Sequence, residues 1–322
     1  MGKGTYHAVC PKTIREEQNM YEYYLPFIGK KSERLYHRVS ADSIRAFAQA
    51  IGEENPVYLD EEYAKTTKYG RMIAPPTYCL SLKTADIPGL WIAPVGRIHA
   101  GQRFVWNRPI YADEVVSIEQ VITNTFEKAG KKGLMVFLEQ TKNVYDADEN
   151  LICSFIVTTI TMEKLFPKDL ENLSVASAES AAAKWQARPS PKMAVGLVFP
   201  EVQLPPVKRM DFVYYAGASG DFNTIHVIDS EAQKVGYPKV IAQGMFTAAL
   251  QGRVAEAWIG DGYRLKDYSL RLAGPVFPDD VLKFNGTVTE LDEASGAIKV
   301  EYKVENMNDQ LVMNGTFEAV VC

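Results

Sequence analysis

The chain has 322 residues, of which 47% are apolar, and 35 basic and 40 acidic residues give a net charge of −5. This composition is ordinary for a globular protein of one or two domains and excludes disorder and collagen-like repeats. The negative charge argues against nucleic acid or an anionic membrane as the main partner, and no stretch approaches the roughly 18 apolar residues of a membrane-spanning helix.

The four cysteines, Cys10, Cys79, Cys153 and Cys322, lie far apart and include no CxxC pair. This spacing favours buried or incidental thiols in a reducing compartment over a zinc site or a disulfide framework. Metal-ligand spacings, phosphate loops and dinucleotide fingerprints are not visible, so we expect no metal and no cofactor. The start of the chain shows no apolar leader, and we therefore expect a cytoplasmic protein.

In chain order, the first predicted element is a tyrosine-rich entry segment at 21–26, which we expect to pack across the first half. Residues 40–51 predict a helix, because a capping serine precedes apolar residues spaced for one helical face. A turn follows at 52–58. Residues 134–138 and 151–157 are apolar on both faces and predict strands that are central or covered.

Residues 163–206 differ in composition from the rest of the chain. Residues 165–186 are rich in Ala, Ser, Glu and Lys and are compatible with a short helix, and five prolines between 188 and 206 indicate an extended connection. We therefore predict a first domain at 1–165, a linker at 166–204 and a second domain at 205–322.

The second half again begins with a predicted helix, at 207–218. Residues 246–259 predict a longer helix, which Gly260-Asp261-Gly262 would end. Residues 282–289 and 298–304 alternate apolar and polar side chains, as expected of antiparallel strands with one wet face. Each half is therefore predicted to be an α+β unit in which an antiparallel sheet wraps a buried helix.

The sequence repeats itself once. Residues 52–58 (GEENPVY) align with residues 220–226 (GDFNTIH), at an offset of 220 − 52 = 168. Ile73-Ala74 aligns with Ile241-Ala242 at the same offset, and later segments align at offsets of 166 and 160. Because the period is long and occurs only twice, this pattern indicates a duplicated domain and not a solenoid.

The clearest chemical signal is the polar turn at 219–226. Asp221 and Asn223 alternate with Phe222, so both polar side chains can point the same way, and His226 could return to the same cleft. A carboxylate and an imidazole in one loop are suited to moving protons to and from a single water, which Asn223 could orient. Taken alone, an Asp-x-Asn turn is more often a structural turn or cap.

The comparison of the halves favours the catalytic interpretation. The first half has Glu53 in place of Asp221 and Tyr58 in place of His226, so the titratable imidazole occurs once. This asymmetry suggests one working and one retired site. Downstream, Gly244 opens the long helix, where bare backbone N–H groups and the helix dipole could stabilise a carbonyl becoming an enolate.

These residues resemble a known motif. Gly220–His226, with Ile241-Ala242 and Gly244-Met245, is similar to the hydratase motif of the MaoC-like (R)-specific enoyl-CoA hydratases and (3R)-hydroxyacyl thioester dehydratases. The first half, with Asn55-Pro56-Val57-Tyr58, resembles the non-catalytic partner domain of that family. The resemblance implies a double hotdog fold, in which each half wraps a long central helix and the two halves form a pseudo-dimer with one active site between them.

The resemblance also implies roles for single residues. Asp221 and His226 would be the catalytic pair and Asn223 the supporting residue. Gly244, with its neighbours Gln243 and Met245, would provide the oxyanion and substrate-binding groups. The chain departs from the family pattern at Thr224, Ile228 and Gln243, where the family commonly has Pro, Asp and His. These departures affect the shape of the loop and the substrate preference more than the chemistry.

The implied activity is the reversible hydration of trans-2-enoyl thioesters to (R)-3-hydroxyacyl thioesters in fatty-acid or related acyl-CoA metabolism. The substrate would be carried by CoA or by an acyl carrier protein, and Arg253, Arg264 and Lys266 would either meet its phosphate or form a solvated face. A hotdog thioesterase and a non-catalytic acyl-binding partner subunit are the alternatives. Chain length, direction and a possible homodimer stay open.

Overall fold

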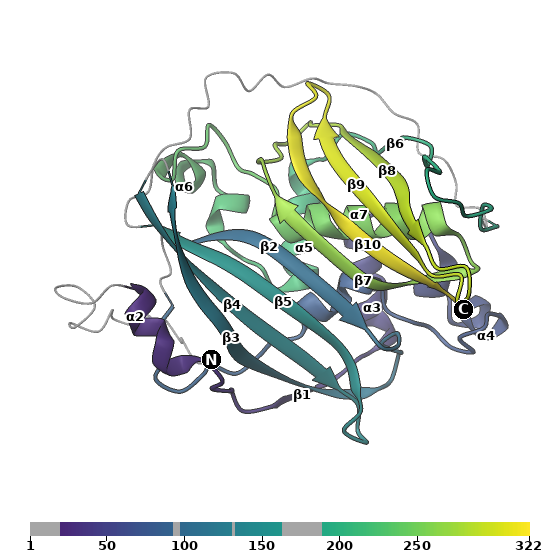
Figure 1. Cartoon of the computed structure of the whole chain (residues 1–322), viewed down its shortest axis with the longest axis horizontal. Helices are drawn as coiled ribbons and strands as arrows, with labels where there is room; N and C mark the ends of the chain where they lie inside the picture. Colours follow the sequence, from purple (N-terminus) through teal and green to yellow (C-terminus); the bar gives the residue numbers. More distant parts are fainter. Residues whose placement is uncertain (1–19, 93–96, 131–132, 163–188) are drawn as a thin grey trace.

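The computed structural model describes residues 20–92, 97–130, 133–162 and 189–322 (Figure 1). Its strands form one antiparallel sheet of ten strands in the order β1-β3-β4-β5-β2-β7-β10-β9-β8-β6. The first half of the chain contributes β1 (Leu35–Arg38), β2 (Arg97–Trp106), β3 (Val115–Gly130), β4 (Gly133–Tyr145) and β5 (Leu151–Met162). The second half contributes β6 (Val202–Gln203), β7 (Tyr263–Leu272), β8 (Leu282–Leu291), β9 (Ile298–Asn306) and β10 (Leu311–Val321).

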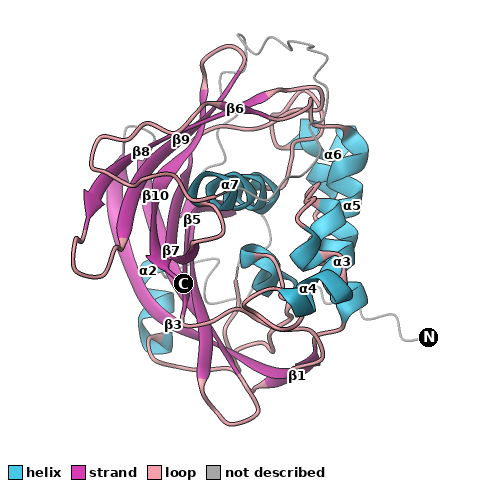
Figure 2. Ribbon diagram, turned by 90° about the vertical axis from the view of Figure 1, so that its right-hand side faces the viewer, coloured by secondary structure: helices cyan, strands magenta, loops and turns pink. Residues whose placement is uncertain are grey.

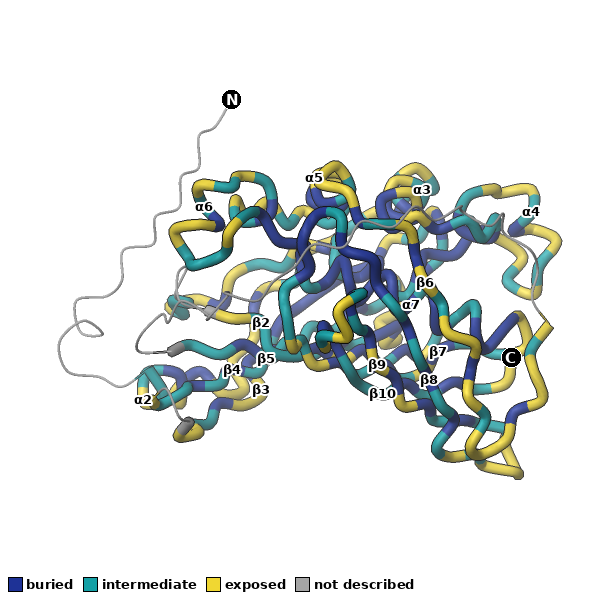
Figure 3. The backbone as a smooth tube through the Cα atoms, turned by 90° about the horizontal axis from the view of Figure 1, so that it is seen from above, coloured by how far each residue is buried: buried dark blue, intermediate teal, exposed yellow. Residues whose placement is uncertain are grey.

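The helices lie on the concave side of this sheet. Figure 2 shows α7 inside the curved sheet, with α3, α4, α5 and α6 in an outer layer, and Figure 3 shows these four in one row. The α-helices are α2 (Met20–Tyr24), α3 (Ala41–Ala50), α4 (Glu61–Thr66), α5 (Arg209–Ser219), α6 (Asp229–Lys234) and α7 (Gly244–Ile259). Short 3₁₀ turns are η1 (Leu25–Phe27), η2 (Pro56–Tyr58), η3 (Pro76–Ser81) and η4 (Thr224–His226). None of the described helices is long and apolar enough to cross a membrane.

The two halves meet along β2 and β7. These strands pair from Gly101↔Arg271 to Val105↔Asp267, which makes the sheet continuous. Phe104 lies at this junction and stacks on Trp106 and Tyr268, with ring centroids 5.5 and 5.7 Å apart. Because one cluster of buried apolar residues extends through both halves, the two halves share a core.

The internal repeat is visible in the element bounds. The start of α5 is offset from the start of α3 by 209 − 41 = 168, and the start of α6 from the start of α4 by 229 − 61 = 168. The start of β7 is offset from the start of β2 by 263 − 97 = 166, and the start of β10 from the start of β5 by 311 − 151 = 160. These offsets are the ones that the sequence predicted, so the duplication is confirmed.

The helices predicted at 40–51, 207–218 and 246–259 are confirmed, as are the strands predicted at 134–138, 151–157, 282–289 and 298–304. The Ser40 hydroxyl caps α3 by accepting a hydrogen bond from the Ser43 amide at 3.1 Å, and α7 ends at Gly260, whose φ of 67° suits a glycine. The entry segment packs on the first half, where Tyr24 and Phe27 belong to a separate small core with Ile122.

The halves differ in their central helix, which the sequence analysis placed in both. α7 occupies this position in the second half, whereas the first half has only η3 followed by an irregular segment. In the repeat, residues 82–91 correspond to the C-terminal part of α7. Pro88 cannot donate the backbone hydrogen bond of a helix, and Gly89 has a φ of 77°, so a continuous helix is blocked there.

The predicted helix at 165–186 lies outside the described residues. Residues 195–204 of the predicted linker pack closely on the second half: β6 pairs with β8, and Phe199 stacks on Trp258 with ring centroids 5.3 Å apart. The Trp258 indole N–H also donates to the Pro200 carbonyl oxygen at 3.0 Å. The domain limits stay a proposal, and these contacts favour a second domain that begins before residue 205.

Candidate active site

The loop that follows α5 in the second half has the same conformation as the loop that follows α3 in the first half. α5 ends at Gly220, whose φ of 78° lies in the left-handed region, and Gly52 occupies the same place with a φ of 63°. Asn223 then accepts a hydrogen bond from the Ile225 amide at 3.4 Å, as Asn55 does from the Val57 amide at 3.1 Å. Asn223 therefore shapes this turn, and its exposed amide group stays only a candidate for a role in chemistry.

The turn brings Asp221 and His226 together. Asp221 Oδ2 lies 3.9 Å from His226 Nε2, too far for a direct hydrogen bond but suited to one water that bonds to both atoms at about 2.8 Å. Asp221 keeps 44% of its side chain exposed, whereas His226 keeps 9%. The pair therefore has one solvent-accessible carboxylate and one imidazole held by the protein.

A backbone contact defines the protonation of His226. Its Nδ1 lies 2.8 Å from the Ile241 carbonyl oxygen, and because a carbonyl only accepts, Nδ1 carries the hydrogen. Burial lowers the pKa of His226 below its usual value of 6.5, and it outweighs the Ile241 bond and the charge of Asp221, which raise it. The ring is therefore neutral at neutral pH, and its Nε2 lone pair faces Asp221 as a base.

The N-terminus of α7 follows closely in the chain. Gly244 is three residues after Ile241, so their Cα atoms lie within about 11 Å of each other. Gly244 is partly accessible, and no side chain of the described residues caps α7, so the N–H groups of Gly244 and Met245 have no intrahelical partner. The glycine also has a packing reason, because a Cβ at this position would lie 2.4 Å from Leu272 Cδ1.

The two neighbours of Gly244 are not exposed to a ligand. Gln243 is fully buried, and its side-chain amide donates to the Phe212 carbonyl oxygen at 3.0 Å, which ties the start of α7 to α5. Met245 is 9% exposed and belongs to the shared core. Of the three predicted substrate-binding residues, Gly244 is partly accessible, whereas Gln243 and Met245 are buried.

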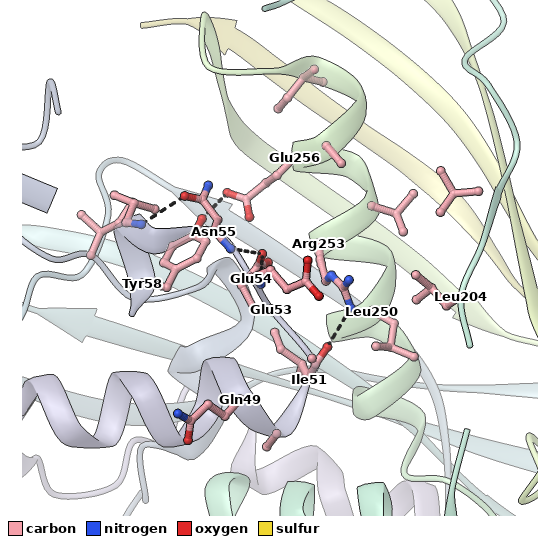
Figure 4. A pocket seen from close by; sticks show the side chains of 18 of the residues that line it. Gln49, Ile51, Glu53, Glu54, Asn55, Tyr58, Leu204, Leu250, Arg253 and Glu256 are labelled. Atoms are coloured by element: carbon pink, nitrogen blue, oxygen red, sulfur yellow. Dashed lines mark hydrogen bonds between the residues drawn. The ribbon is translucent and has the colours of Figure 1, made fainter. Parts of the chain in front are cut away.

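A second group of polar residues, around Tyr58 and Glu256, was not predicted from the sequence. A cavity of about 750 Å³ lies between the first-half loop 51–58 and α7, and Asp221, Asn223, His226 and Gly244 do not line it (Figure 4). Tyr58 and Glu256 meet there, although they are 198 residues apart in the sequence. One signal was available: Arg253 and Glu256 are the only charged residues in α7 and lie one turn apart.

Comparison with known proteins agrees with this geometry. A family profile described as "FAS1-like, dehydratase domain region" matches residues 26–155, and one described as "MaoC like domain" matches residues 194–310. Together they cover most of the chain. It belongs to the MaoC-like dehydratase family. The resemblance of the 220–226 motif to that family is thereby confirmed.

Individual relatives extend the match. A UPF0336 protein of Thermobifida fusca is 33% identical over 133 residues, which are 39% of this chain and 82% of the relative. The 3-hydroxyacyl-thioester dehydratase X of Mycobacterium tuberculosis is 29% identical over 222 residues, which are 66% of this chain and 70% of the relative. A solved MaoC-like dehydratase superposes with a TM-score of 0.74 at 20% identity and covers 92% of this chain and 98% of its own. The fold of this MaoC-like chain is a double hotdog, as predicted.

Proposed function

We propose that this MaoC-like chain is a hydro-lyase that interconverts trans-2-enoyl thioesters and (R)-3-hydroxyacyl thioesters. The observation that carries the proposal is the pairing of Asp221 Oδ2 with the unprotonated Nε2 of His226 at 3.9 Å, beside the start of α7. The name of the relative in M. tuberculosis, a 3-hydroxyacyl-thioester dehydratase, supports the same substrate class. CoA and an acyl carrier protein are both suitable carriers.

In this proposal, Asp221, His226 and the start of α7 each take part in the hydration. A water held by both side chains gives its hydroxyl to C3 of the enoyl group and one proton to His226 Nε2. Negative charge then moves to the thioester oxygen, where N–H groups at the start of α7 stabilise it. The Asp221–His226 pair returns one proton to C2, so one water is added across the double bond. Dehydration follows the same steps in reverse.

The test is the hydration of crotonyl-CoA, followed by the loss of the enoyl absorbance, with the product's stereochemistry determined separately. Asp221→Asn keeps the size of the side chain but removes the charge, and His226→Gln removes the base. Because general acid–base groups contribute typically 10²–10⁴ in rate, we expect each variant to lose at least about a hundredfold in kcat/KM while it stays folded.

Two matched control variants distinguish this loss of activity from a nonspecific effect of substitution on the fold. His37→Gln removes an imidazole on β1, and Asp148→Asn removes an exposed carboxylate in the turn between β4 and β5. Both should keep activity within a few-fold of the parent. Activity of the Asp221 and His226 variants in that same range would contradict the proposal, and tight binding of crotonyl-CoA by the parent without turnover would support the acyl-binding alternative instead.

A further inference from the structure

The cavity near Tyr58 has the size and the walls of a small-molecule site. Its volume of about 750 Å³ lies within the range of roughly 300–1,000 Å³ that is usual for ligand sites. It opens between the first-half loop, the second half of α7 and the segment 202–207. Much of its wall is apolar, with side chains that include Ile51, Val57, Leu204, Leu250, Val254 and Ile259.

A hydrogen-bonded pair of polar side chains, Tyr58 and Glu256, lies in this wall. Tyr58 donates its hydroxyl hydrogen to Glu256 Oε1 at 2.6 Å, and Figure 4 shows Glu256 reaching from α7 toward the loop that carries Tyr58. Burial raises the pKa of Glu256 to about 8, so the carboxyl is protonated at neutral pH. Since Oε1 accepts from Tyr58, the acidic hydrogen belongs on Oε2.

That oxygen has no partner. Glu256 Oε2 is buried and makes no hydrogen bond to any residue in the described part of the chain. A buried hydroxyl without an acceptor is unfavourable, and native proteins seldom leave one in this state. Because Oε2 is covered, a small turn of the Glu256 side chain, which lines the cavity, is needed to bring it to a ligand's carbonyl oxygen, and such a ligand would then satisfy it.

The cations at the cavity already have partners. Arg253 donates to the Ile51 carbonyl oxygen at 3.4 Å and attracts the carboxylate of Glu53, while Lys68 donates to the Asp261 carbonyl oxygen at 2.6 Å. The remaining charged lining residues are acidic: Glu54, Asp211 and Asp261. An anionic ligand would therefore be repelled by these carboxylates, whereas an uncharged ligand would not.

We propose that this cavity is a second ligand site, separate from the Asp221–His226 pair, and that it binds an uncharged acyl chain through a carbonyl oxygen that accepts from Glu256 Oε2. The apolar wall takes the chain, and the Tyr58–Glu256 pair takes the carbonyl. The site is a binding site and involves no covalent step. It rests on the cavity and its contacts and does not depend on the proposed hydration activity.

The first experiment measures binding of S-octanoyl-N-acetylcysteamine to the full chain by calorimetry. This uncharged thioester is saturated, so the proposed hydration cannot consume it. We expect it to bind at pH 6.5 and to bind His226→Gln equally well. Sodium octanoate, which is anionic, should bind at least tenfold more weakly. Equal binding of octanoate and the thioester would overturn the assignment to an uncharged ligand.

The second experiment tests whether Glu256 is the donor. In the parent, raising the pH from 6.5 to 9 ionises Glu256 and removes its hydrogen, so affinity should fall about tenfold. Glu256→Gln keeps a donor at every pH, so its affinity should not change with pH, whereas the exposed control Glu293→Gln should behave like the parent. The other groups that face Glu256 and could titrate or shift it are Glu53, Tyr58, Lys68, Tyr69, Arg253 and Arg264. The same pH dependence in Glu256→Gln would overturn the assignment.

The third experiment tests whether the ligand binds in this cavity. Ala257 lines the cavity from α7, and Ala257→Trp should fill it and abolish binding without touching the Asp221–His226 loop. Unchanged affinity in this variant would overturn the site. Competition by octanoyl-CoA would identify a CoA thioester as the natural source of the acyl chain, and competition only by uncharged esters or amides would identify a carrier-free lipid.

Discussion

Replacing Glu256 by glutamine should make the protein more stable, and more so as the pH rises. Burial raises the pKa of this carboxyl from its ordinary value of 4.5 to about 8, so the folded state binds its proton more tightly than the unfolded state does. Between those two values the unfolded state binds fewer protons, and stability therefore falls as the pH rises. Glutamine keeps the acceptor for the Tyr58 hydroxyl but cannot ionise.

The magnitude follows from the same two values. The difference of 8 − 4.5 = 3.5 units, at about 1.4 kcal/mol each, sets an upper bound of about 5 kcal/mol on the penalty above pH 8. Relaxation of the protein around a buried charge lowers this penalty, so we expect a measured gain of about 1–5 kcal/mol at pH 9 and almost none at pH 4.5.

Urea unfolding of the parent and of Glu256→Gln, at intervals from pH 4.5 to 9, measures this gain. The difference in the free energy of unfolding between the two proteins should grow from pH 4.5 to 8 and level off above pH 8. The exposed Glu293→Gln variant provides the matched loss of charge and should track the parent at every pH. A constant gap between the parent and Glu256→Gln would refute the reasoning, because it would mean that Glu256 has the same pKa in both states.

Two further predictions concern the Asp221–His226 pair and the junction of the two halves at β2 and β7. An NMR titration of the His226 ring should give a pKa below 6.5, and Asp221→Asn should lower it further because the Asp221 charge raises it; a pKa above 6.5 in the parent would contradict the burial argument. Phe104→Ala removes a fully buried ring stacked between Trp106 and Tyr268, and urea unfolding should show a loss of about 3–5 kcal/mol in a single transition of both halves. Separate transitions would show that the shared core does not couple them.

Much of the fold was predictable because its signals are local. The cap at Ser40, the glycine that ends α7 and the alternation along β8 and β9 each depend on residues close together in the sequence. The internal repeat added information about tertiary structure, since two copies of one pattern must adopt related folds. The Asp221–His226 pair was predictable for the same reason: the two side chains are close in sequence, and a tight turn brings them together.

The rest depended on contacts that no local pattern encodes. The repeat predicted a long helix in each half, but Pro88 and the loop around it replace that helix in the first half. The contact between Tyr58 and Glu256 joins residues 198 positions apart, and it exists because the first-half loop lies across α7 of the second half. A cavity bounded by both halves could therefore be found only once they were placed together.

The two copies of the turn show how one backbone supports two different kinds of site. Glu53 folds back on its own chain, where Oε1 accepts from the Glu54 and Asn55 amides at 2.9 and 3.0 Å, and burial raises its pKa. Asp221 is one methylene shorter, and its Oδ1 accepts from the Asn223 amide at 3.3 Å, which leaves Oδ2 facing His226. A buried carboxyl resists ionisation, whereas a half-exposed one beside a neutral imidazole can hold a water and exchange a proton with it. This difference favours the second copy for the proposed proton transfer and the first copy for the proposed binding of an uncharged group.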